Sequence, residues 1–239
     1  MRVSQNKIIS RQLLILHCIF YFITIVFSPF MHYITHLSKD KKLNRLIANS
    51  PAHKLIKRKN ICIYLCASIM SQQLSVKVAD VIFQRFLGLY GGNEPSPQQI
   101  LDTPSETLRG IGLSNAKANY VKNVAQFETE QGMDHKKLSR MDNETVISYL
   151  TEIKGVGRWT VEMLLMFALG REDVFSIDDL GIQNAMIHIY KLDRADKKKF
   201  REDLLKISFR WSPYRTYACL YLWQWKDNMP VKRKKAEIK

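Results

Sequence analysis

The stretch Leu150-Thr-Glu-Ile-Lys-Gly155-Val156-Gly157-Arg158-Trp159-Thr160 decides the fold. Apolar residues at helical spacing stand on both sides of it, and Gly155 and Gly157 let the backbone turn sharply between them. The stretch therefore predicts a helix-hairpin-helix over residues 144–169. The N–H groups that open its second helix point outward, toward an anion.

A DNA phosphate fits the geometry of such a hairpin. We expect the contacts to come from Gly155, Val156, Gly157, Arg158 and Thr160. Contacts to phosphates fix a protein on the duplex without reading its sequence. Taken alone, the motif has a second interpretation, a glycine turn that only joins two packed helices.

The charge of the whole chain agrees with a polyanionic partner. Its 239 residues include 37 Lys and Arg against 22 Asp and Glu, so the formal net charge is +15. Such a charge fits a polyanionic partner such as nucleic acid or a membrane surface, and it does not distinguish between them. Its length and its hydrophobic content of 46% are sufficient for one or two domains with a buried core.

From residue 40 onward the pattern predicts an all-α fold. Apolar residues recur at helical spacing between short turn signals, and no two-residue alternation is long enough to build a sheet. Ser114 and Asp142 are predicted N-caps, and Ser212 is a predicted N-cap for a helix over 213–226. Lys117 is interpreted as a solvated lysine.

The cysteines predict neither disulfides nor a metal site, because they are few and irregularly spaced: Cys18, Cys62, Cys66 and Cys219. Reduced thiols of this kind are typical of a cytoplasmic protein. The histidines suggest no metal ligands either, since no second ligand stands at metal spacing.

Residues 1–30 form an apolar extension whose role the sequence leaves open. The run from Leu13 to Phe30 is just long enough to span a bilayer. Basic residues flank it on both sides, so the charge bias that orients a membrane helix is missing, and no small-residue cleavage site follows it. Three interpretations remain: translation that begins at Met31, a membrane anchor in residues 13–30, or another role. At the other end, residues 231–239 form a solvated basic tail.

A pair of carboxylates follows the hairpin. The segment Asp173-Val-Phe-Ser-Ile-Asp178-Asp179 places Asp178 and Asp179 at the start of the next predicted helix. Together with the hairpin, it resembles the helix-hairpin-helix DNA glycosylase superfamily and is most similar to the alkylation-repair branch, DNA-3-methyladenine glycosylase II. The similar residues extend from about 68 to 225. In that family the second Asp of the pair is catalytic, so the resemblance implies that Asp179 is catalytic and Asp178 is a cap or a solvated neighbour.

The implied reaction suits a carboxylate at the start of a helix. Cleavage of the bond between sugar and purine develops positive charge on the sugar, and an ionised Asp179 stabilises that oxocarbenium-like transition state. The helix dipole favours the anionic form of Asp179. An alkylated purine such as 3-methyladenine is already cationic and leaves easily once it is flipped out of the duplex. Without the hairpin, an Asp at this place predicts only a helix cap.

Trp159 distinguishes simple hydrolysis from strand cleavage. Family members that also cut the strand carry a lysine at the matching position, and its amine forms a Schiff base with the sugar. Tryptophan cannot form one, so the resemblance implies a monofunctional enzyme without lyase activity. Only Cys219 stands near the C-terminus, which excludes the four-cysteine iron–sulfur cluster of the endonuclease III branch. No cofactor is expected to be required, although the resemblance allows a structural monovalent cation at the hairpin carbonyls.

The resemblance also assigns a base pocket and a gap-filling loop. Trp159, Trp223 and Met163 are the pocket residues, because aromatic faces attract a cationic base. Met163 stands where some relatives have an aromatic residue, which leaves the base preference open. Gln72 and Gln73 resemble the loop that fills the gap left by the flipped base. By themselves, Trp223 is typical of a helix core and the two glutamines of a surface turn.

The family's architecture implies two helical lobes with the active site in the cleft between them. We expect a six-helix bundle over 68–175 and a terminal lobe built from 31–67 and 176–230. The expected partner is double-stranded DNA with a damaged base, bound by a monomer. Three alternatives remain: a glycosylase for another damaged base such as hypoxanthine or an etheno adduct, a non-catalytic helix-hairpin-helix DNA-binding protein, and a repair domain tethered to a membrane.

Overall fold

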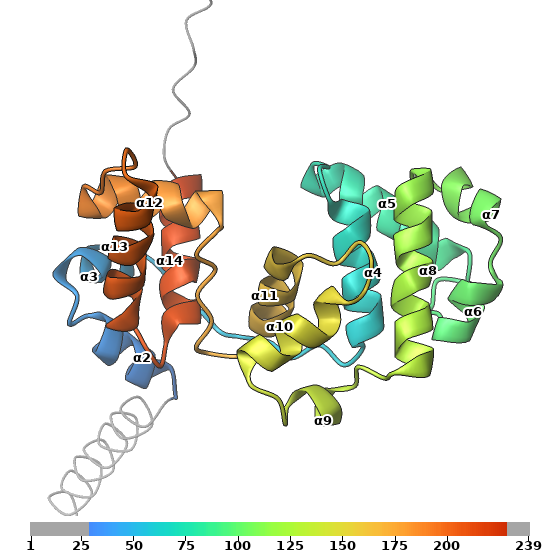
Figure 1. The fold of residues 1–239 in the computed structure, drawn as a ribbon, viewed down its shortest axis with the longest axis horizontal. Helices are drawn as coiled ribbons and strands as arrows, with labels where there is room; N and C mark the ends of the chain where they lie inside the picture. The colour runs from blue at the N-terminus through green and yellow to red at the C-terminus, as the bar shows by residue number, and fades with distance from the viewer. Residues whose placement is uncertain (1–28, 229–239) are drawn as a thin grey trace, which may run out of the picture. The chain divides into compact units, whose positions relative to one another are not determined.

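The computed structural model describes residues 29–228, and every regular element within this range is an α-helix. The predicted all-α class is therefore confirmed (Figure 1). The interpretations of residues 1–28 and of the tail 231–239 lie outside the described residues. Among the helices that are described, none has the length and hydropathy needed to cross a bilayer.

The chain divides into two compact units. One unit is Leu55–Leu180 and the other joins the residues up to Lys54 with those from Gly181 onward. The boundaries predicted from the sequence are 67/68 and 175/176. The first observed boundary lies earlier because a single helix, α4 (Ile61–Ser71), runs across residue 68 and packs against α8 (Asn115–Glu130).

The unit Leu55–Leu180 contains eight helices, not the six that the sequence analysis expected. Besides α4 and α8 they are α5 (Val76–Gly88), α6 (Pro97–Asp102), α7 (Ser105–Gly110), α9 (His135–Leu138), α10 (Asn143–Thr151) and α11 (Arg158–Phe167). The higher number arises because short segments between turn signals, such as the four residues of α9, also complete a helical turn.

The core of this unit forms where α4 meets α8 and α11. Seven of the eleven residues of α4 are buried, as is the run from Thr160 to Met166 in α11. A helix that is apolar on all sides belongs inside a bundle. Ser114 and Asp142 cap α8 and α10 by accepting hydrogen bonds from backbone N–H groups, as predicted.

The second unit contains five helices within the described range, namely α2 (Pro29–Leu37), α3 (Lys41–Ile47), α12 (Leu180–Tyr190), α13 (Lys197–Phe209) and α14 (Arg215–Asp227). The ring of Tyr33 stacks on that of Tyr217, with centroids 3.8 Å apart. Asp40 accepts hydrogen bonds from the Tyr190 hydroxyl at 2.9 Å and from the Trp211 indole at 3.3 Å. Stacked tyrosines and a partly buried carboxylate bonded to two further aromatic side chains therefore contribute to this core.

The helix predicted over 213–226 begins later, at Arg215, and its N-cap residue is Tyr214 instead of Ser212. The prediction of a Ser212 cap was wrong because the residues after α13 form turns. The N–H of Ser212 donates to the carbonyl of Phe209, and the N–H of Tyr214 donates to the carbonyl of Trp211.

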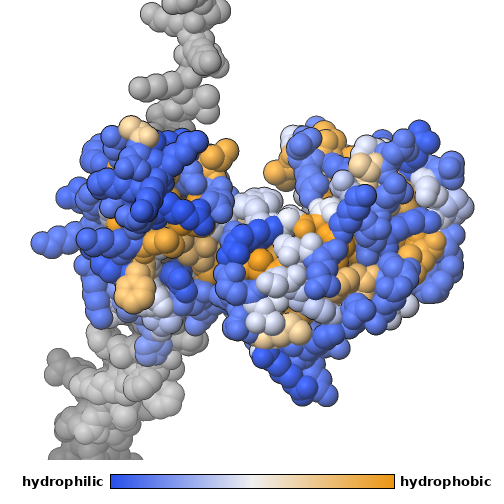
Figure 2. All heavy atoms as spheres, in the orientation of Figure 1, coloured by the Kyte–Doolittle hydropathy of each residue, from blue (hydrophilic) through white to orange (hydrophobic). Residues whose placement is uncertain are grey.

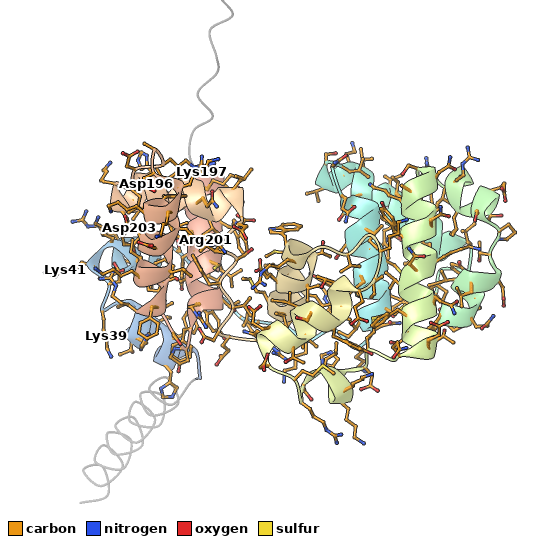
Figure 3. All side chains as sticks on the ribbon, in the orientation of Figure 1. Lys39, Lys41, Asp196, Lys197, Arg201 and Asp203 are labelled. Carbon is orange, nitrogen blue, oxygen red and sulfur yellow. The ribbon has the colours of Figure 1, made fainter. Side chains whose placement is uncertain are left out.

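Charged side chains occupy the outer faces of the helices. Figure 3 labels several of them on the second unit, including the exposed Lys197 and Arg201 of α13. Lys199 and Asp203, one turn apart on the same helix, form an ion pair at 2.7 Å. Hydrophilic residues dominate the face drawn in Figure 2, in agreement with the high content of Lys and Arg.

Candidate active site

The predicted helix-hairpin-helix is present as α10, a turn and α11. Gly155 has a φ of +103°, in the region that side chains rarely adopt. A Cβ atom at this position would lie 2.3 Å from Cγ of Tyr120 on α8. Glycine is therefore required at position 155 for two reasons, the backbone conformation and the close approach of Tyr120.

The second glycine has a different role. Gly157 is the N-cap residue of α11 and provides no side-chain cap. It is exposed, and a Cβ atom added there would meet no atom within 4 Å. The first N–H groups of a helix have no intrahelical acceptor. The start of α11 thus offers backbone donors next to a position without a side chain, which leaves room for an anion to approach.

The other predicted hairpin residues point elsewhere. Val156 and Thr160 are buried. The Arg158 guanidinium donates to both carboxylate oxygens of Glu144, at 2.6 and 2.9 Å, and to Glu162 at 3.0 Å. Hydrogen bonding to Glu144 raises the pKa of Arg158. Side-chain contacts to DNA from these three residues are not favoured by this arrangement, so the backbone is the better candidate.

The central contact of the site joins the hairpin to the carboxylate pair. The indole Nε1–H of Trp159 donates to Oδ2 of Asp179 at 2.8 Å. Asp179 immediately precedes α12, and its own N–H donates to the carbonyl of Ser176 at 3.2 Å. Half of the Trp159 surface remains exposed. Asp179 and Trp159 belong to the same unit. A side chain of α11 therefore orients the predicted catalytic carboxylate.

A second carboxylate, which the sequence analysis missed, supports the same loop. Glu162 is 2% exposed, and the buried Ser176 hydroxyl donates to it at 2.5 Å. Burial raises the pKa of Glu162, while the bonds from Ser176 and Arg158 oppose that rise. Glu162 and Ser176 together tie α11 to the segment that carries Asp179. No sequence signal identified them, because an acidic residue within a helix is usually solvated.

The predicted pocket residues fall on two helices. Met163 lies one turn after Trp159 on α11 and is buried, and its carbonyl accepts a hydrogen bond from the Tyr64 hydroxyl at 3.2 Å. Trp223 lies on α14, in the other unit, and is partly buried. The structure therefore brings Trp159 and Met163 to one helix, while the part of Trp223 in the pocket stays a prediction.

The predicted gap-filling loop connects α4 to α5. Gln72 is the C-cap residue of α4, and the exposed Gln73 has a φ of +60°. Lys117, interpreted from the sequence as solvated, is instead partly buried and bonded to this loop. Its ammonium group donates to the carbonyls of Met70 at 3.0 Å and Gln72 at 2.7 Å. Lys117 is held here because these carbonyls lie at the end of α4, where no intrahelical donor reaches them.

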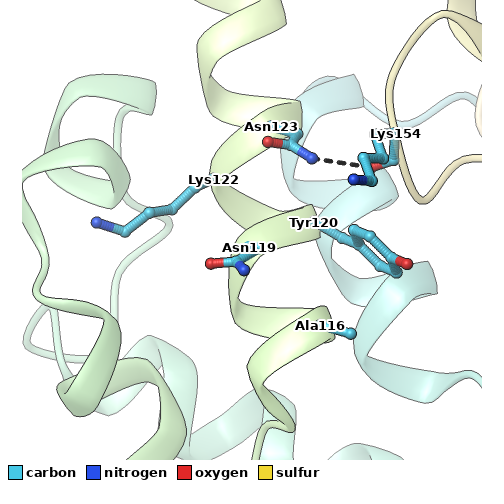
Figure 4. A pocket seen from close by; sticks show the side chains of 6 residues that line it. All are labelled: Ala116, Asn119, Tyr120, Lys122, Asn123 and Lys154. Carbon is cyan, nitrogen blue, oxygen red and sulfur yellow. Dashed lines mark hydrogen bonds between the residues drawn. The ribbon is translucent and has the colours of Figure 1, made fainter.

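A hollow of about 480 Å³ lies beside the hairpin, separate from Asp179. It is lined by Ala116, Asn119, Tyr120, Lys122 and Asn123 of α8 and by Lys154 of the hairpin (Figure 4). The side-chain amide of Asn123 donates to the carbonyl of Lys154 at 3.1 Å. This surface fixes the hairpin on α8.

The described residues do not single out a cation site. Within residues 29–228 no group of three or more His, Cys, Asp or Glu side chains is placed to hold a metal ion. Of the hairpin carbonyls, that of Lys154 already accepts a hydrogen bond from Asn123 and that of Gly155 from Gln72.

Comparison with known proteins places this arrangement among DNA repair proteins. Residues 66–208 match the HhH-GPD family, whose description is "HhH-GPD superfamily base excision DNA repair protein". DNA-3-methyladenine glycosylase 1 of Schizosaccharomyces pombe is 37% identical over 187 residues, which are 77% of this chain and 80% of the relative.

Solved structures agree. The crystal structure of a DNA-3-methyladenine glycosidase from Bacillus halodurans superposes with a TM-score of 0.72 at 36% identity, covering 84% of this chain and 91% of that one. The 3-methyladenine DNA glycosylase of Schizosaccharomyces pombe, in complex with abasic DNA, superposes with a TM-score of 0.69 at 35% identity, covering 81% and 95%.

Proposed function

Because the chain belongs to the HhH-GPD superfamily of base excision DNA repair proteins, we propose that it is a monofunctional DNA glycosylase. It hydrolyses the N-glycosidic bond of alkylated purines such as 3-methyladenine in duplex DNA. The observation that carries this proposal is the hydrogen bond between Trp159 and Asp179. Through this bond, a residue of the helix-hairpin-helix orients the carboxylate of Asp179. Relatives named for 3-methyladenine support the choice of base.

Asp179 acts as the electrostatic partner of the sugar. As the glycosidic bond breaks, positive charge develops on the sugar ring, and a carboxylate held beside it stabilises that charge. The bond from Trp159 and the anchor to Ser176 hold Asp179 before the substrate arrives. Such preorganisation means that no reorientation is needed during the reaction. The same carboxylate orients the attacking water.

Trp159 has a second task, which is recognition of the base. Its half-exposed indole presents a face on which a flat, cationic purine stacks. The base is expelled as a neutral purine, so a strong general acid is not needed. Trp159 also provides no amine for a Schiff base. The product is therefore an abasic site in an uncut strand.

The two remaining predicted regions bind the DNA itself. The backbone N–H groups at the start of α11 hold a phosphate, and Gln73, with Gln72 beside it, fills the gap in the base stack. Both regions belong to the unit Leu55–Leu180. The protein is expected to act as a monomer on double-stranded DNA.

The test is release of methylated bases from alkylated duplex DNA by the full chain. Wild type is expected to release methylpurine, with strand breaks only after alkali. Asp179→Asn should bind the duplex and lose most turnover, at least about a hundredfold. Asp178→Asn, the matched control next to it, removes the same charge and should retain turnover, since Asp178 is exposed and Trp159 bonds to Asp179.

Three other results would redirect the proposal. Breaks before alkali would indicate a lyase. Release of hypoxanthine or an etheno base without methylpurine would change the substrate. Binding without release of any of these bases would favour a non-catalytic DNA-binding protein.

A further inference from the structure

The loop after α4 has a backbone conformation that its own sequence does not stabilise. Gln73 lies in the left-handed region at φ +60°, which few residues other than glycine, asparagine and aspartate adopt. Conformations of this kind persist only where surrounding contacts hold them. The contacts in question come from a distant part of the chain.

Lys117 supplies two of these contacts from the first turn of α8. Its ammonium group donates to the carbonyls of Met70 and Gln72, at 3.0 and 2.7 Å. These carbonyls lie at the C-terminal end of α4. A positive charge at this end of a helix also interacts favourably with the helix dipole. Burial lowers the pKa of Lys117. One side chain thus binds Met70, in the last turn of α4, and Gln72, the first residue of the loop.

The same loop is joined to the hairpin. The side-chain amide of Gln72 donates to the carbonyl of Gly155 at 3.4 Å. Gly155 in turn packs against Tyr120, which follows Lys117 by one turn on α8. Helix α8 therefore contacts the gap-filling loop through Lys117 and the hairpin through Tyr120, and the two DNA-binding regions share one support.

We propose that Lys117 is a positioning residue for base flipping. It fixes the gap-filling loop at a set distance from the hairpin, so that Gln73 enters the base stack where the hairpin holds the backbone. This proposal rests on the function proposed above. It assigns Lys117 no contact with the substrate and no part in bond cleavage.

This role predicts that the effect of Lys117 depends on whether the damaged base is paired. A gap-filling loop matters most where the damaged base is paired and stacked, because extrusion then costs the most free energy. Where the base has no partner, extrusion is easier and the loop matters less. A lysine that only stabilised the fold would affect both substrates equally.

The experiment measures single-turnover release of N7-methylguanine placed at one site in a duplex. In one substrate it faces cytosine, and in the other it faces an abasic-site analogue. For Lys117→Met we expect a loss of about tenfold on the paired substrate, since two bonds from a charged donor disappear, and a loss of less than about threefold on the unpaired one. Lys117→Arg, which keeps the charge and the donors, should restore most of the rate on the paired substrate.

Lys122→Met is the matched control. Lys122 lies on the same helix and also donates to a backbone carbonyl, that of Leu101, at 3.0 Å. This variant removes the same charge without touching the gap-filling loop, so its rates on the two substrates should fall by equal factors or not at all. Thermal unfolding of each variant shows that the protein is folded. Should Lys117→Met fail to fold, Lys117→Gln, which keeps a donor on a shorter side chain, takes its place.

The outcomes separate the two proposals. An equal loss on both substrates, or no loss, overturns the positioning role of Lys117 while the glycosylase function stands. Absence of release by wild type from either substrate counts against the proposed function instead. A selective loss on the paired substrate that arginine repairs supports the positioning role.

Discussion

The indole N–H of Trp159 and the carboxylate of Asp179 lie 2.8 Å apart although 20 residues separate them in the chain. The bond joins the first turn of α11 to the residue before α12. A ring suited to stacking and a carboxylate suited to charge stabilisation are therefore held in direct contact.

Trp159→Phe keeps an aromatic face and removes the N–H donor. A hydrogen bond to a charged group contributes about 1.5–3 kcal/mol, so we expect the single-turnover rate to fall by about tenfold or more while the affinity for damaged duplex changes little. Trp159→Ala also removes the stacking face and should weaken affinity in addition. Single-turnover rates and binding isotherms measure both quantities. A phenylalanine variant as fast as wild type would show that the bond does not aim Asp179.

Glu162→Ala should destabilise the protein strongly. The change leaves Arg158 with one fewer partner and the buried Ser176 hydroxyl with none of its described acceptors. Breaking a buried ion pair costs about 3–5 kcal/mol, and the exposure of Arg158 places the expected loss at the lower end. Glu144→Ala is the control, because this exposed partner of Arg158 should cost less than about 1 kcal/mol. Urea unfolding monitors both, and equal losses would contradict the importance of Glu162.

Alanine substitutions separate the two hairpin glycines. Gly155→Ala forces a Cβ atom to within 2.3 Å of Tyr120 at a φ of +103°, and the strain should cost about 2 kcal/mol or more of stability. Gly157→Ala meets no neighbour and should cost less than about 1 kcal/mol. We nevertheless expect Gly157→Ala to weaken binding to undamaged duplex, because its methyl group would stand at the start of α11, where we propose that the backbone holds a phosphate. Unchanged affinity would place the phosphate elsewhere.

Asp40 should give part of the stability a dependence on acid. Burial would raise the pKa of this carboxyl, but hydrogen bonds from Tyr190, the N–H of Leu43, Trp211 and the N–H of Lys42 hold it below its ordinary value. A folded-state pKa below the unfolded one contributes stability that is present above the unfolded pKa, near 3.8, and is lost as the pH falls through the folded pKa.

The comparison with Asp40→Asn tests this dependence. Asparagine can still cap α3, where Asp40 accepts from backbone N–H groups. Wild type should be more stable than the variant at pH 7, and the difference in unfolding free energy should shrink as the pH falls below 3.8 and through the lowered pKa of folded Asp40. A difference that is constant over this range would show that the charge of Asp40 does not contribute.

Local patterns predicted the fold class and much of its detail. The hairpin followed from two glycines between apolar helices, and the caps at Ser114 and Asp142 followed from residue types that accept N–H groups. The start of α14 did not follow, because the turns after α13 depend on how Trp211 is buried. Sequence patterns describe what a segment does by itself, so they fail where a neighbouring element decides.

The candidate site shows the same division. Asp179 and Trp159 were predicted because they stand at fixed places in a motif, and their direct bond remained unknown until the two segments were seen together. Glu162 was missed and Lys117 was wrongly interpreted as solvated for one reason. Each is a charged residue in a helix, which is ordinarily solvated, and each is partly or fully enclosed here because distant segments supply its partners.

The pairing of Arg158 with Glu144 and Glu162 has a consequence for how the protein responds to ionic strength. Binding of a free arginine to DNA displaces condensed counterions, and each such displacement makes affinity fall as salt rises. The charge of Arg158 is already neutralised by carboxylates within the protein. The hairpin would therefore bind a phosphate through its backbone N–H groups, and this contact would release few counterions from the DNA. The salt sensitivity of the protein would then come from lysines and arginines outside the motif that decides its fold.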